Sequence, residues 1–145
     1  MAQGTTLPRI LCGIAAALLV AGCGGRFGPE QEKALRARVT GYLEALQAAQ
    51  FARAYQEFWK TQPRRVEEME ALLALQWQND GTFVRYEIAG VTGKSASEAE
   101  VSVSVTMSVH VPGSGEEKET TSLKTWTWST QNGSWFFHGD YHGPG

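Results

Sequence analysis

The sequence contains few cysteines, few aspartates, no strongly basic segment and no long apolar run. Its cysteines, Cys12 and Cys23, are too few for a disulfide-stapled scaffold, so stability must come from a packed core. The net charge of −2 and the lack of any basic cluster beyond Arg64-Arg65 argue against a nucleic-acid partner, which requires a concentrated basic face. The longest uncharged apolar run, Ile10 to Ala21, has 12 residues, whereas a membrane-spanning helix needs about 20.

This short apolar run has the features of an export signal. It follows a segment, Met1 to Arg9, with one basic side chain and no acid, and it ends in Leu19-Val20-Ala21-Gly22-Cys23. The ending resembles the lipobox recognised by lipoprotein signal peptidase, in which small residues precede the cysteine that is acylated. The resemblance predicts that residues 1–22 are a cleaved lipoprotein signal peptide and that Cys23 carries the lipid. An ordinary secretory signal is the alternative.

The lipid on Cys23 implies a place for the protein at the cell envelope. A diacylglyceryl group plus an N-acyl chain gives effectively permanent membrane anchoring, because each buried CH₂ contributes about 0.8 kcal/mol. Gly24 follows the cysteine, where retention in the inner membrane favours aspartate. By resemblance to lipoprotein sorting in diderm bacteria, we expect the outer membrane, with the protein facing the periplasm. Residues 23–29 are then the lipidated cysteine and a short tether.

The spacing of apolar residues after the tether predicts three helices. The first spans about Glu30 to Ala49, since Pro29 suits a first helical turn and early acids favour the positive end of the helix dipole. A second, short helix follows a bend near Gln50, and a third begins after Pro63 and ends at Asn79-Asp80-Gly81. The apolar stripes are, in chain order, Leu35, Val39, Tyr42, Leu43 and Leu46; Phe51, Ala54, Tyr55, Phe58 and Trp59; and Val66, Met69, Leu72, Leu73 and Trp77.

After Gly81 the apolar period changes from helical to two, which predicts strands. The first strand is Thr82 to Val91, closed by a turn at residues 92–95. The second is Ala99 to Val111, whose valines and Met107 face the core and whose serines, threonine and histidine, including the lone surface residue His110, face water. A turn at residues 112–115 leads to a third strand at about Thr120 to Thr130.

Asn132-Gly133 is a strong signal for a tight hairpin between the third strand and a fourth. Counting outward from a two-residue turn pairs Gln131 with Ser134, and directly opposed residues share a face of the sheet. The counting predicts an inner, helix-facing side with Trp126, Trp128, Trp135 and Phe137. It predicts an outer side with Thr125, Thr127, Ser129, Phe136, His138 and Asp140.

Three helices followed by an antiparallel meander resemble the nuclear transport factor 2-like superfamily. The resemblance extends from about Gln31 to Tyr141 and is carried by Tyr42-Leu43-Glu44-Ala45-Leu46, Phe51-Ala52-Arg53-Ala54-Tyr55 and Asn132-Gly133-Ser134-Trp135. Ala49-Gln50 stands where many members have Gly-Asp. The resemblance implies an α+β fold over residues 30–142, in which N-terminal helices pack on a curved antiparallel sheet of about four strands. It also implies a pocket on the inner sheet face, used in relatives for small apolar ligands, partner proteins or catalysis.

The catalytic residues of the ketosteroid isomerases in that superfamily are only partly matched. Those enzymes use a strand aspartate as base, with a tyrosine and a protonated aspartate as hydrogen-bond donors. Here Asp80 falls in a predicted turn and Asp140 on the outer side of the last strand, so neither is predicted to point into the pocket. Tyr42 or Tyr55 could supply a donor. We therefore expect no enzyme and no cofactor, with a pocket enzyme of the ketosteroid isomerase type as the alternative.

Two further groups of residues are candidate sites. His138, Asp140 and His142 would share a face of an extended strand and are suitable ligands for Zn²⁺ or Cu²⁺, although accidental spacing is the favoured interpretation. Aromatic side chains either line the pocket or fill it, and a pocket filled by Trp and Phe side chains, which leaves only an interaction surface, is the favoured interpretation. The residues expected there are Tyr42, Tyr55, Trp77, Tyr86, Trp126 and Trp128.

The sequence therefore predicts a membrane-anchored envelope lipoprotein with a non-catalytic binding or assembly domain. Its partner is a protein or a small apolar ligand. The Ser/Thr-rich outer face of the sheet is a candidate surface for homodimerisation, although plain solvation explains the same composition.

Overall fold

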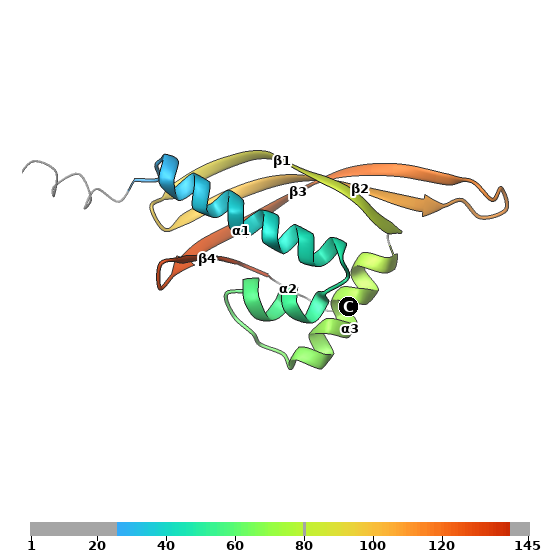
Figure 1. Ribbon diagram of the computed structural model, residues 1–145, viewed down its shortest axis with the longest axis horizontal. Helices are drawn as coiled ribbons and strands as arrows, with labels where there is room; N and C mark the ends of the chain where they lie inside the picture. The colour runs from blue at the N-terminus through green and yellow to red at the C-terminus, as the bar shows by residue number, and fades with distance from the viewer. Residues whose placement is uncertain (1–25, 80, 140–145) are drawn as a thin grey trace, which may run out of the picture.

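Three helices precede a four-stranded antiparallel sheet in the computed structural model, which describes residues 26–79 and 81–139 (Figure 1). The predicted signal peptide and Cys23 lie outside the described residues. Within the described residues, no helix is both long enough and apolar enough to span a membrane. The elements are α1 (Pro29–Gln47), α2 (Phe51–Phe58), α3 (Val66–Asn79), β1 (Thr82–Ser95), β2 (Glu98–His110), β3 (Glu117–Gln131) and β4 (Ser134–Phe137). This is the α+β arrangement that the sequence predicts.

Helix α1 begins as predicted and ends two residues early. Pro29 occupies its first turn, and the backbone N–H of Gly28 donates to Oε1 of Gln31 at 3.0 Å. At the other end, the N–H of Gln50 donates to the carbonyl of Ala45, and Ala49 takes a left-handed φ of 56°. This is a Schellman ending, which reverses the chain and produces the bend predicted near Gln50.

The sheet has the order β1-β2-β3-β4, with each strand antiparallel to the next. Strand β1 runs through residues 92–95, so the turn predicted there is wrong, and the tight turn lies at Ala96 and Ser97. The polar composition of those residues suggested a turn, but Gly93 pairs with Ala99 of β2 and extends the ladder. Strand β3 likewise begins three residues before its predicted start.

The Asn132-Gly133 hairpin has the predicted register where β3 and β4 pair. Trp128 is opposite Phe137, and Thr130 is opposite Trp135. The same counting from the turn would also pair Trp126 with Gly139, but this pair does not form, because β4 ends at Phe137. There the chain turns toward the helices, and the N–H of Lys60 donates to the Phe137 carbonyl at 2.8 Å.

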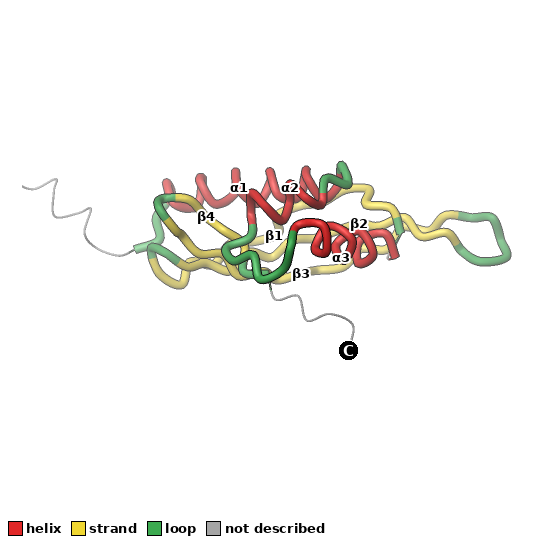
Figure 2. Tube along the Cα trace, turned by 90° about the horizontal axis from the view of Figure 1, so that it is seen from below, coloured by secondary structure: helices red, strands yellow, loops and turns green. Residues whose placement is uncertain are grey.

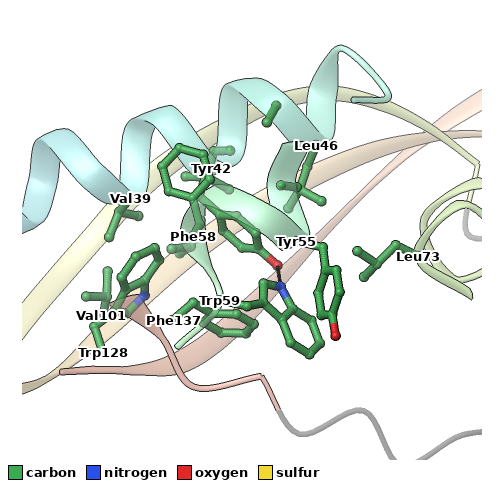
Figure 3. Close-up of a cluster of buried hydrophobic side chains, with 14 of the residues drawn as sticks. Val39, Tyr42, Leu46, Tyr55, Phe58, Trp59, Leu73, Val101, Trp128 and Phe137 are labelled. Carbon is green, nitrogen blue, oxygen red and sulfur yellow. Dashed lines mark hydrogen bonds between the residues drawn. The ribbon is translucent and has the colours of Figure 1, made fainter. Parts of the chain in front are cut away.

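The core lies between the helices and the inner face of the sheet (Figure 3). Val101, Val103 and Val105 are fully buried there, and Trp128, Trp135 and Phe137 are buried beside them. The helices therefore pack on the face of the sheet that the sequence predicts to be the inner one.

The outer face and the far end of the sheet differ from the predicted pattern at three positions. Thr106 is buried on the predicted wet face, where its hydroxyl lies 2.9 Å from that of Thr121 on β3. Ser129 is also buried and shares a hydrogen bond with His138. Val109, predicted to face the core, is 37% exposed because the β2–β3 hairpin projects beyond the helices (Figure 2).

Candidate ligand-binding cleft

A cleft of about 710 Å³ opens between α3 and the inner face of β3. Aromatic and aliphatic side chains make up about half of its lining, and polar residues and a glycine make up the rest. Pockets that hold small ligands have volumes of about 300–1,000 Å³ and combine aromatic or aliphatic walls with polar groups. The principal apolar residues are Tyr42, Trp59, Leu73, Trp77, Trp126 and Phe137, and the polar ones include Gln76, Asn79, Lys124, Thr125 and His138.

The floor of the cleft is a cluster of three aromatic side chains from α1, the α2 end and β4 (Figure 3). Nε1 of Trp59 donates a hydrogen bond to the Tyr42 hydroxyl at 3.2 Å, and the Tyr42 and Phe137 rings lie 5.0 Å apart. Burial raises the pKa of Tyr42 well above its ordinary value. The hydroxyl therefore stays protonated, and no acceptor among the described residues takes its proton.

The mouth of the cleft carries one Lys or Arg side chain, Lys124. Its ammonium group lies 5.5 Å from the centre of the Trp77 ring, a cation–π arrangement that places the charge at the mouth. Within the described part of the chain, no carboxylate lines the cleft and none forms an ion pair with Lys124. The cleft therefore combines aromatic walls with polar groups, and Lys124 is the one Lys or Arg side chain among its described lining residues.

A second hollow of about 500 Å³ continues from the first along β2 and β3. The two share Trp77, Asn79 and Lys124, and the second adds Met107 and Val109. Trp77, whose ring centre is 5.4 Å from that of Phe83, forms a wall common to both. Lys124 consequently stands between the two hollows.

Three of the six predicted pocket residues line the cleft, namely Tyr42, Trp77 and Trp126. Tyr55 does not, because its hydroxyl donates to the Arg64 carbonyl at 2.7 Å and accepts from the Arg64 N–H. Tyr86 and Trp128 also lie elsewhere. Trp128 is fully buried, and its indole N–H has no partner among the described residues. The aromatic side chains thus fill the deep part of the cone and leave its mouth open.

Lys124 is a residue of the cleft that the sequence did not lead us to predict there. A signal was available, since Lys124 lies two residues from Trp126 and alternate residues of a strand share a face. Its pairing with Val103, an inner-face residue of β2, establishes that position.

The predicted metal ligands are only partly within the described residues. His138 bonds to Ser129, whereas Asp140 and His142 lie outside that part of the chain. No group of three or more His, Cys, Asp or Glu residues suitable for a metal ion occurs in residues 26–79 and 81–139. The metal site stays a prediction.

Comparisons with known proteins identify the fold. No protein-family model and no curated protein matched the sequence. Among solved structures, a ketosteroid isomerase-like protein from Erwinia carotovora atroseptica SCRI1043 is similar, with a TM-score of 0.58 and 20% identity over 77% of this chain and 92% of that one. A protein from Shewanella oneidensis MR-1, described as NTF-2 like and of unknown function, has a TM-score of 0.53 and 13% identity over 73% and 93%.

The chain has the nuclear transport factor 2-like fold. Its superfamily resemblance, predicted from the sequence, is confirmed at the level of fold. The cleft lies between the helices and the inner sheet face, where the resemblance implied a pocket. Sequence identities this low establish the fold alone, and function must be argued from the cleft.

Proposed function

We propose that this protein is a lipoprotein anchored through Cys23 that binds a small ligand without transforming it. The ligand has a largely apolar body and one anionic group. The lipobox-like sequence supports the anchor. The position of Lys124 at the mouth of an aromatic cleft supports the ligand class, and it is the observation that carries the proposal.

The chemistry of the cleft favours an amphipathic anion over a wholly apolar molecule. Trp77, Trp126 and Phe137 offer flat faces for an apolar or aromatic body, whose burial is worth about 25 cal/mol per Å². A lysine at the rim of such a cavity attracts a ligand's anionic group, and the low-dielectric walls strengthen the attraction. The ammonium group of Lys124 can contact that anionic group while it stays partly in water, so little free energy is lost in desolvating the ammonium group.

The enzyme alternative requires a base in the cleft, where the described lining holds no carboxylate and offers only His138, whose Nε2 shares a hydrogen bond with the Ser129 hydroxyl. Proton abstraction next to a carbonyl needs a base and a hydrogen-bond donor. The Tyr42 hydroxyl is a suitable donor, since it is protonated and has a free proton. A carboxylate base would have to come from Asp80 or Asp140, which lie outside the described residues. Binding without catalysis is therefore the better-supported function.

A matched pair of fluorescent probes tests the ligand class. Anilinonaphthalene sulfonate and phenylnaphthylamine share an aromatic skeleton and differ by one anionic group. With the chain lacking residues 1–23, we expect the sulfonate to bind more tightly by about fivefold, corresponding to about 1 kcal/mol for a partly exposed charge pair. The change Lys124→Met should remove this preference. Lys33→Met, at an exposed position on α1, is the matched control and should retain it.

Two outcomes would contradict the proposal. Equal affinity of the unaltered protein for both probes would mean that the charge at the mouth does not select a ligand. A preference that survives Lys124→Met would place the binding site elsewhere.

The outer face of the sheet is a second candidate surface, for a partner or a second copy of the chain. Leu123 is 67% exposed there, opposite Ser104 of β2 and among small hydroxyl side chains. A second copy packed on this face would remove the leucine side chain from water, which favours association. We propose a homodimer through this face.

Sedimentation should show a dimer that Leu123→Glu converts to a monomer. A monomer at all concentrations of the unaltered protein would contradict the homodimer.

A further inference from the structure

Phe27, which the sequence analysis assigns to the tether, packs against the folded domain. Its ring meets that of Trp135 edge to face, with centres 5.9 Å apart. It also lies against Gly93 of β1, where any side chain would collide with the ring. Directly afterwards, the Gly28 N–H is held by Gln31 and α1 begins. The chain is therefore fixed to the domain from Phe27 onward.

The docked phenylalanine leaves a very short connection to the lipidation site. The four residue steps from Cys23 to Phe27 span at most about 14 Å when fully extended. A lipid on Cys23 would thus hold the Phe27 end of the domain within that distance of the membrane surface. This step rests on the anchoring proposed above.

We propose that Phe27 sets the orientation of the domain on the membrane. The end formed by Phe27, the β1–β2 turn and the β3–β4 turn faces the lipid headgroups, and the mouth of the cleft faces away. Both turns adjoin Phe27, because Gly93 precedes the first and Trp135 follows the second. Figure 1 shows the start of α1 and these turns together at one end of the molecule.

The far wall of the cleft lies at the opposite end of the same strand. Trp77 packs on Phe83, ten residues from Gly93 along β1, and a strand rises about 3.3 Å per residue, which separates them by about 30 Å. The β2–β3 hairpin projects beyond the helices at this end as well (Figure 2). A ligand can therefore enter from the aqueous side without passing between the domain and the bilayer.

The chemistry of the Phe27 end suits contact with headgroups and does not favour insertion. Its turns are Ala96-Ser97 and Asn132-Gly133, and Lys94 nearby forms an ion pair with Glu100. The exposed large apolar residues found in the described chain, Leu75, Val109 and Leu123, lie on α3, β2 and β3 away from these turns. Exposed Arg26 and Glu98 add one charge of each sign beside Phe27 and the first turn, so the end is polar and close to neutral.

Two exposed serines in turns provide matched reporters for a test. Ser97 lies at the Phe27 end and Ser114 lies in the β2–β3 turn at the other end. In the acylated chain Cys23 has no free thiol, so Ser97→Cys or Ser114→Cys carries a single fluorescent label. Each labelled lipoprotein is placed in phosphatidylethanolamine and phosphatidylglycerol vesicles containing a headgroup-attached quencher. We expect quenching at position 97 to exceed that at position 114 severalfold.

Two altered chains show whether Phe27 and the short connection cause the difference. Inserting twenty Gly/Ser residues after Gly25 adds a flexible link of about 25 Å root-mean-square length, which should bring the two quenching values close together. Phe27→Ala should reduce the difference partly. Equal quenching at both positions in the unaltered, vesicle-bound protein would overturn the proposed orientation and leave the anchor intact.

Flotation of the same samples with vesicles reports the anchor separately. Protein that floats confirms anchoring, and the quenching ratio then decides the orientation. Protein that does not float contradicts the lipid anchor and, with it, the orientation that rests on it.

Discussion

Nε of Arg38, on α1, donates a hydrogen bond to the main-chain carbonyl of Trp135, on β4, at 2.9 Å. The same guanidinium donates to the Glu57 carbonyl at the end of α2, at 2.6 Å, and lies 4.4 Å from the centre of the Phe58 ring. One side chain thus joins three elements that are distant in the sequence.

Replacing Arg38 by methionine should lower the free energy of unfolding by about 2 kcal/mol, because charge-assisted hydrogen bonds are lost while the apolar stem is kept. Urea denaturation measures the change. Arg36→Met is the control, since Arg36 forms only an exposed pair with Glu32 and should change stability by less than about 0.5 kcal/mol. Equal effects of the two changes would mean that Arg38 does not join these elements.

Ala49 occupies a backbone conformation that costs an L-residue about 1 kcal/mol relative to glycine. We therefore expect Ala49→Gly to raise the free energy of unfolding by about that amount. Ala48→Gly, one residue earlier with an ordinary negative φ, should lower it. Thermal and urea denaturation of the two variants measure the opposite signs. A loss of stability in Ala49→Gly would show that α1 does not end in a left-handed residue.

The buried Tyr42 hydroxyl makes stability depend on alkaline pH. Its pKa is raised in the folded protein, whereas in the unfolded chain it titrates near 10. The unfolded chain therefore loses the proton first, and the contribution of Tyr42 to stability, complete below about pH 10, is lost as the pH rises further. In Tyr42→Phe the decline between pH 10 and pH 11 should be shallower.

The same change should cost about 1–2 kcal/mol at neutral pH, because the Trp59 N–H loses its acceptor. Denaturation at pH 7 measures this cost. Unchanged stability, or an equally steep alkaline decline in the variant, would contradict the buried hydrogen bond.

Gly93 and Phe27 should show strong energetic coupling. Gly93→Ala places a methyl group against the Phe27 ring and should destabilise the fold by about 1–3 kcal/mol, the typical cost of overpacking. In a Phe27→Ala background the same change should cost little, since the ring is gone. A double-mutant cycle by urea denaturation gives the coupling energy. Additive effects would show that Phe27 does not lie against Gly93.

The elements that local chemistry determines could be predicted from the sequence. Asn132-Gly133 fixed the turn type, and the turn then determined the register of Trp128 with Phe137. The apolar stripes likewise located the three helices. These features depend on residues that are close together in the chain, and their patterns are complete within a short window.

The features of the fold and the cleft that could not be predicted depend on contacts between residues distant in the sequence, which no local pattern encodes. Residues 92–95 have the composition of a turn and become strand because β2 pairs with them and Phe27 lies against Gly93. Thr106 can be buried because its hydroxyl shares a hydrogen bond with the Thr121 hydroxyl. For the cleft, the aromatic residues of the helical stripes led to the correct prediction that Tyr42 and Trp77 line it. Whether their rings would fill the cone or leave an opening depended on three-dimensional packing.

Native mass spectrometry tests the central claim most directly, using the chain without residues 1–23, exported to a bacterial periplasm and purified without refolding. We predict a bound small mass that denaturation releases, that is acidic and largely apolar, and that Lys124→Met retains poorly while Lys33→Met retains it fully. A ligand-free mass in every sample, together with no preference for the sulfonate probe, would contradict a ligand-binding cleft.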